Sequence, residues 1–77
     1  MTLHLTNHAV RRYAQRGRMT LPEAREELTR LLPAAVRLWE FDGMVDYELP
    51  GGCRLVVSPQ GAVVTCWWKR ARYGRRR

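Results

Sequence analysis

The hydrophobic pattern of this sequence changes period at Pro33, and this change constrains the fold more than any other feature. Before Pro33 the apolar residues recur at helical spacing, and after it they alternate with polar residues in short runs bounded by glycine and proline. We therefore expect an α+β fold in which two N-terminal helices pack on one face of a four-stranded antiparallel sheet. That arrangement buries the apolar stripes of both layers.

The first helix is predicted to run from His8, with Thr6-Asn7 as its N-terminal cap and Gly17 as the residue that stops it. At 100° per residue, Ala9, Val10, Tyr13 and Ala14 fall on one face. The other face carries His8, Arg11, Arg12, Gln15 and Arg16. The helix is therefore amphipathic, and its outer face is basic.

A capping box predicts the start of the second helix. In Thr20-Leu21-Pro22-Glu23, the threonine hydroxyl and the glutamate carboxylate each satisfy an open backbone donor, and proline is tolerated in the first turn. Apolar residues then follow at helical spacing: Leu21, Ala24, Leu28, Leu31 and Leu32. We expect Pro33 to end this helix.

Four strands are predicted after Pro33, at residues 36–39, 44–49, 53–57 and 62–68. Strict alternation directs Leu38, Val45, Tyr47, Leu55, Val57, Val64 and Cys66 toward the helices. The opposite face then carries Arg37, Trp39, Arg54, Thr65, Trp67 and Lys69, together with Asp46 and Glu48. Because Trp67 and Trp68 are adjacent, one of the two must face inward.

The charge balance favours a polyanionic partner. The 77 residues include 14 Lys and Arg against 7 Asp and Glu, a net charge of +7, and thirteen of the cations are arginine. Arginine pairs with phosphate oxygens and stacks on bases, so nucleic acid is the leading partner class. We interpret residues 1–68 as a single domain and residues 69–77 as a basic C-terminal arm. A chain this short offers a shallow groove rather than a deep active site.

Other classes of protein are disfavoured. No apolar run approaches the roughly 18 residues of a membrane span, so we expect a soluble, cytoplasmic protein. The two cysteines, Cys53 and Cys66, are not spaced as metal ligands, and His4 and His8 lie far upstream. We therefore expect buried thiols, no metal site and no cofactor.

Exposed aromatic residues beside cations are typical of single-stranded nucleic-acid binding, because bases stack on the rings while phosphates pair with the cations. The residues predicted to bind nucleic acid are Arg11, Arg37, Arg54, Trp67, Lys69, Arg70 and Arg72. Two observations oppose this interpretation. Either tryptophan of the pair can instead cap the core, and Asp46 and Glu48 add negative charge to the same face.

The segment 7–17 has the form H-A-x-x-R-x-x-x-R-G. It resembles the opening helix of small bacterial and phage-encoded domains related to the RelE-type and barnase–EndoU–colicin-type toxin ribonucleases. In that family a short leading segment precedes the helix, and the final strand resembles Val63-Val64-Thr65-Cys66-Trp67. The resemblance implies a toxin-like, metal-independent ribonuclease or RNA-binding domain, with catalytic positions at His8, Arg12, Arg16 and Thr65. It also implies an acidic antitoxin partner.

The chemistry of these residues fits RNA cleavage independently of the resemblance. His8, Arg12 and Arg16 are spaced by four and share a helix stripe, so they can act on one phosphate or on neighbouring ones. The imidazole can accept the proton of a ribose 2′-hydroxyl, while the arginines and Thr65 stabilise the phosphorane. The general acid stays open between Tyr47, Tyr73 and an arginine.

The sequence also departs from the ribonuclease pattern. No histidine follows His8, and Arg18-Met19 interrupts the junction between the two helices. An alternative is a non-catalytic phage or bacterial regulator that binds and inhibits a host enzyme, such as the transcription machinery, or nucleic acid. A plain nucleic-acid binder is a third possibility.

Overall fold

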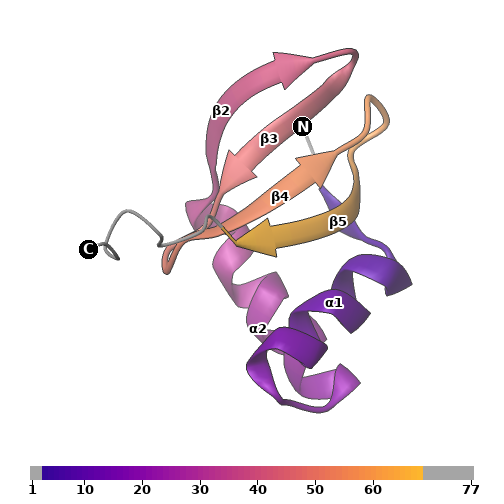
Figure 1. The fold of residues 1–77 in the computed structure, drawn as a ribbon, viewed down its shortest axis with the longest axis vertical. Helices are drawn as coiled ribbons and strands as arrows, with labels where there is room; N and C mark the ends of the chain where they lie inside the picture. The colour runs from indigo at the N-terminus through magenta and orange to yellow at the C-terminus, as the bar shows by residue number, and fades with distance from the viewer. Residues whose placement is uncertain (1–2, 69–77) are drawn as a thin grey trace, which may run out of the picture.

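Two helices pack against one side of a five-stranded sheet in the computed structural model, which describes residues 3–68 (Figure 1). The helices are α1 (Asn7–Gly17) and α2 (Leu21–Leu31), followed by a 3₁₀ turn, η1 (Leu32–Ala34). The strands are β1 (His4–Leu5), β2 (Val36–Phe41), β3 (Met44–Glu48), β4 (Cys53–Val57) and β5 (Ala62–Trp68). They are arranged in the order β1-β5-β4-β3-β2.

The α+β class and the two helices are confirmed, but the prediction of four antiparallel strands is incomplete. The sheet is mixed, because β1 adds a fifth strand parallel to β5. The backbone N–H of His4 donates to the Gly61 carbonyl (2.9 Å), and the Thr6 hydroxyl donates to the Val63 carbonyl (2.6 Å). A strand of two residues has no measurable alternation, so sequence periodicity misses it.

Both helices begin at the caps that the sequence predicts. Thr6 accepts from the backbone N–H of Ala9 (3.3 Å), and the Thr20–Glu23 capping box is formed in both directions. The end of α1 differs from the prediction. Gly17 is the last helical residue, and Arg18 takes the left-handed conformation, with φ 56° and ψ 48°.

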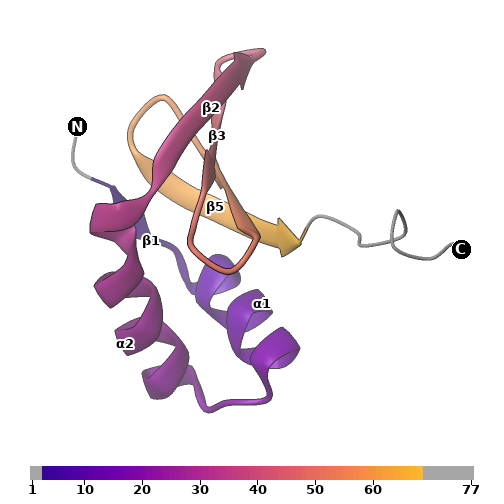
Figure 2. The same cartoon turned by 90° about the vertical axis from the view of Figure 1, so that its left-hand side faces the viewer.

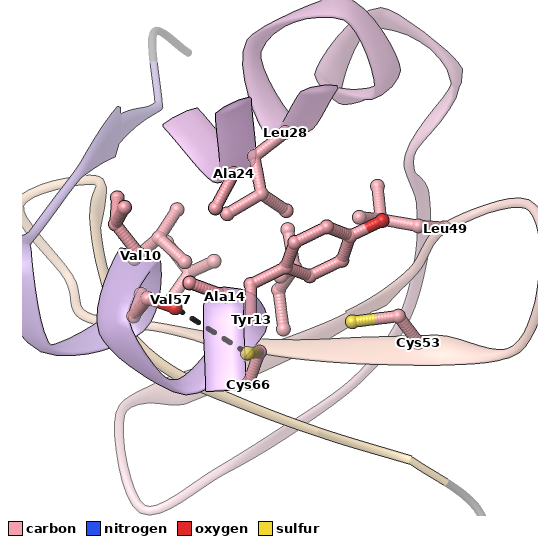
Figure 3. Packing of buried hydrophobic residues seen from close by; sticks show 12 residues of the cluster. Val10, Tyr13, Ala14, Ala24, Leu28, Leu49, Cys53, Val57 and Cys66 are labelled. Carbon is pink, nitrogen blue, oxygen red and sulfur yellow. Dashed lines mark hydrogen bonds between the residues drawn. The ribbon is translucent and has the colours of Figure 1, made fainter. Parts of the chain in front are cut away.

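The core lies between the helix pair and the middle of the sheet (Figure 3). The buried side chains that form it include Ala9, Val10, Ala14, Ala24, Leu28, Leu49, Leu55, Val57, Val63 and Cys66. Alanines at the contact let the helices approach each other and the sheet closely. Val63, rather than the predicted Val64, is the fully buried valine of β5, because a bulge shifts the register between β4 and β5.

A second bulge corrects the predicted position of Arg37. Arg37 is paired with Tyr47 and Trp39 with Asp46, so Leu38 is an extra residue in β2. Tyr47 is in turn opposite Leu55, which is buried beneath the helices. Arg37 therefore belongs to the helix side of the sheet and does not share a face with Trp39.

The β2–β3 hairpin projects away from the two helices, which cover the other end of the molecule (Figures 1 and 2). The side chains of β2 are consequently exposed or only partly covered. Within residues 3–68, neither helix is long and apolar enough to cross a membrane.

Candidate nucleic-acid interface

The outer face of α1 is basic and contains no acidic residue. Its apolar face is buried on the sheet and on α2, so the remaining side chains point outward. These include three arginines, Arg11, Arg12 and Arg16, and the helix has no Asp or Glu to offset them. The eleven residues of α1 thus present a net charge of +3 to solvent. This predicted feature is confirmed.

Two of these arginines meet the end of β5. The Arg12 Nε donates to the Cys66 carbonyl (3.3 Å), and the Arg16 guanidinium lies 4.9 Å from the centre of the Trp68 ring. Together with Gln15 they line a hollow of about 200 Å³, named the Arg–Trp hollow below. Pockets for whole small molecules measure roughly 300–1,000 Å³, so this hollow suits a smaller group such as a phosphate.

Trp68 is held in place from the core side. Its ring centre lies 5.8 Å from that of Tyr13, and the Tyr13 hydroxyl donates to Glu27 Oε2 (2.7 Å). Burial and this hydrogen bond raise the pKa of Tyr13, so the phenol stays protonated and keeps donating to Glu27. A rigidly supported indole beside two guanidinium groups forms a preorganised surface.

The sequence did not identify Trp68 or Gln15 as part of this site. The signal for Trp68 was present, because Trp67 on the open face requires the next residue to face the helices. Trp67 is paired with Arg54 and Trp68 with Cys53. Trp68 contacts Arg16 only because of the way in which α1 crosses the sheet. A local sequence pattern does not predict that crossing.

The predicted catalytic residues do not all point the same way. His8 is exposed on α1, one turn before Arg12. The Cys66 thiol donates to the Ala9 carbonyl of α1 (3.6 Å), so Cys66 faces this helix and its neighbour Thr65 faces away from it. The structure thus brings Arg12 and Arg16 together and directs Thr65 to the other face of β5.

Arg54 is built into the open face rather than presented on it. Its guanidinium lies 5.2 Å from the centre of Trp39 and 5.5 Å from that of Trp67, and the residue is only 8% exposed. Its Nε has no hydrogen-bond partner within residues 3–68, and Glu48 Oε1 lies 4.0 Å away. Arg54 therefore clamps two tryptophans together and is poorly placed to meet phosphate.

Other predicted residues lie apart from the Arg–Trp hollow. Arg37 forms an exposed ion pair with Glu40 (3.3 Å), and Tyr47 is half-buried on the helix side of β3. Lys69, Arg70, Arg72 and Tyr73 fall outside the described residues. The open face thus keeps Asp46 and Glu48, while its described cation is enclosed between aromatic rings.

The net charge differs between the two helices, because α2 carries three glutamates against Arg25 and Arg30, a net charge of −1, whereas α1 carries +3. Glu23, Glu26 and Glu27 line a separate hollow of about 430 Å³ together with Arg30. A polyanion is therefore attracted more strongly to α1 than to this hollow. Cys53 and Cys66 are buried thiols, and contact with Cys66 together with burial raises the pKa of Cys53. Residues 3–68 contain no group of three potential metal ligands.

Comparison with known proteins does not assign a role to this surface. No protein-family model, curated protein or solved structure matches the chain. The function is therefore inferred from the chemistry of α1 and of the Arg–Trp hollow.

Proposed function

We propose that this protein binds single-stranded RNA through the outer face of α1 and the Arg–Trp hollow. One observation carries the proposal: Arg12 and Arg16 flank Trp68 at the end of an acid-free helix. Guanidinium groups pair with phosphates, and the plane of the Arg16 guanidinium, supported by the Trp68 ring beneath it, offers a surface on which a base can stack. These two interactions together are the chemistry of sequence-tolerant binding to a single strand.

The surroundings of Arg12 favour a phosphate contact. Its Nε is engaged with the backbone of β5, which fixes the guanidinium before any ligand arrives. Less side-chain freedom is then lost on binding. Arg11 of α1 and Arg25 of α2, whose Nη2 donates to Asn7 Oδ1 (3.1 Å), line another hollow between the two helices. Basic side chains therefore occur on α1 outside the Arg–Trp hollow as well, where they can attract further phosphates.

We further propose that the domain is related to the toxin ribonucleases that its α1 motif resembles. Three features support this: the H-A-x-x-R-x-x-x-R-G pattern on α1, the order of two helices before a strand meander, and the short strand β1 that precedes the helix. His8, exposed on the same helix as Arg12, would then supply the base for cleavage. Because Thr65 faces away from α1, it has no place in this site.

Fluorescence anisotropy with labelled single-stranded RNA over a range of salt concentrations tests the binding. Arg12→Gln and Arg16→Gln are each expected to weaken binding and to flatten the slope of log Kd against log salt by about 0.7. Arg16→Lys should keep the salt slope but lose affinity, because an ammonium does not stack on Trp68 as a planar guanidinium does. Arg30→Gln, an equal loss of charge on the acidic helix α2, is the control.

Two outcomes would contradict the proposal. A flat salt response would exclude phosphate contacts, and equal losses for Arg30→Gln and Arg16→Gln would indicate diffuse attraction rather than a site on α1. Cleavage is read in the same samples with a chelator present. Products that appear with the wild type and disappear with His8→Ala would establish a ribonuclease, whereas intact RNA at saturation would establish a binder.

A further inference from the structure

The strand at the end of the sheet is unusually apolar on its exposed surface. Within residues 3–68, three of the four exposed large hydrophobic residues lie on β2: Val36 is 60% exposed, Trp39 49% and Phe41 78%. The fourth, Leu21, begins α2. The hairpin that carries β2 projects beyond the helices, so neither helix covers it (Figure 2).

The outer edge of β2 is unpaired and carries only part of the usual protection. No described strand pairs with it, so a row of backbone N–H and C=O groups faces outward. Edge strands commonly carry lysine or proline, which discourage another strand from pairing. Neither occurs between Val36 and Phe41, where the protection consists of the charges of Arg37 and Glu40 and the bulge at Leu38.

The side chains of β2 are complementary to themselves when the strand is reversed. Arg37 and Glu40 lie on the helix side, opposite Tyr47 and Val45 respectively, while Phe41 shares the other face with Trp39. If two copies of β2 pair antiparallel with Arg37 opposite Glu40 of the second copy, Val36 falls opposite Phe41. Each ion pair and each apolar pair then occurs twice about a twofold axis, as a symmetric interface requires.

We propose that two copies of this chain associate through the β2 edges, in this register, and join their sheets into one. The charge pattern selects a second copy over an unrelated strand, because each Arg37, which pairs with Glu40 of its own chain, also lies opposite the Glu40 of the second copy. The exposed apolar side chains of β2 would be covered by the same contact. This inference is independent of the proposed RNA binding, which uses α1 and the end of β5 rather than β2.

The mass in solution tests the proposal, measured by sedimentation and light scattering on RNA-free protein between about 1 and 500 µM. We expect a concentration-dependent shift from 9.0 kDa toward twice that mass. Phe41→Ser should abolish the shift, because it removes an apolar side chain from the proposed interface. The monomer itself should stay folded, because Phe41 is largely exposed in it. Leu21→Ser, which removes an exposed apolar residue from α2, should dimerise like the wild type.

Charge reversal tests the register. Arg37→Glu and Glu40→Arg each place like charges opposite one another twice, and each should weaken the dimer about tenfold. The double variant restores opposite charges and should recover the wild-type mass. A wild type that stays monomeric throughout, or a dimer that survives Phe41→Ser, would overturn the proposal. Single reversals without effect would overturn the register.

Discussion

The junction between α1 and α2 offers a sharp test of the structure against the sequence pattern. Glycine normally supplies the left-handed residue after a helix, and the pattern assigns that position to Gly17. In the structure Arg18 has φ 56° instead, while Gly17 is helical. Arg18 therefore bears a backbone conformation that costs a residue with a Cβ roughly 1–2 kcal/mol.

We expect Arg18→Gly to stabilise the protein. Glycine relieves the strain but loses about 0.5–1 kcal/mol to its greater freedom in the unfolded chain. The net gain is about 0.5–1 kcal/mol, which raises the melting temperature of a domain of this size by about 2–8 °C. Thermal unfolding followed by circular dichroism measures it. Arg18→Ala, which removes the same charge but keeps the Cβ, should show no such gain.

Gly17→Ala completes the comparison. A Cβ at Gly17 would lie 2.5 Å from Met19 Cε, the end of a flexible side chain that can swing aside. Alanine raises the helix propensity at this position by about 1 kcal/mol, which offsets the cost of displacing the Met19 side chain. The substitution should therefore leave the stability of the protein nearly unchanged. A large loss of stability in Gly17→Ala, with no gain of stability in Arg18→Gly, would place the left-handed residue at position 17 and refute the reasoning.

Two further predictions concern buried polar groups. The pKa of Tyr13 is raised in the folded state, so its contribution to stability is complete below about pH 10 and is lost as the pH rises above that value. Tyr13→Phe should therefore lose less stability between pH 9 and 11 than the wild type in urea titrations; parallel curves would contradict this. Arg54→Met fills the space between Trp39 and Trp67 and removes a buried nitrogen that lacks a partner, so it should lower the free energy of unfolding by less than about 1 kcal/mol. Arg54→Ala leaves that space empty and should lower it by about 2–4 kcal/mol. RNA affinity should be unchanged in Arg54→Met. A clear loss of affinity would show that Arg54 takes part in RNA binding.

The sequence by itself determined the secondary structure almost completely. The capping threonines Thr6 and Thr20 mark both helix starts, and the periodic apolar residues identify which face of α1 is buried. These signals are local, because caps and amphipathic periods are set by neighbours within one or two turns. For the same reason, the basic outer face of α1 was readable before any fold was known.

The tertiary structure decided everything that depends on register and on contacts between distant segments. Bulges at Leu38 and Val64 each insert one residue, which reverses the side-chain alternation beyond it and moves Arg37 to the helix side. The strand β1 exists only because β5 is there to pair with it. Trp68 joins Arg16 because α1 packs across the end of β5, fifty residues further along the chain. Periodicity describes one segment at a time, whereas the proposed binding surface lies where two segments meet.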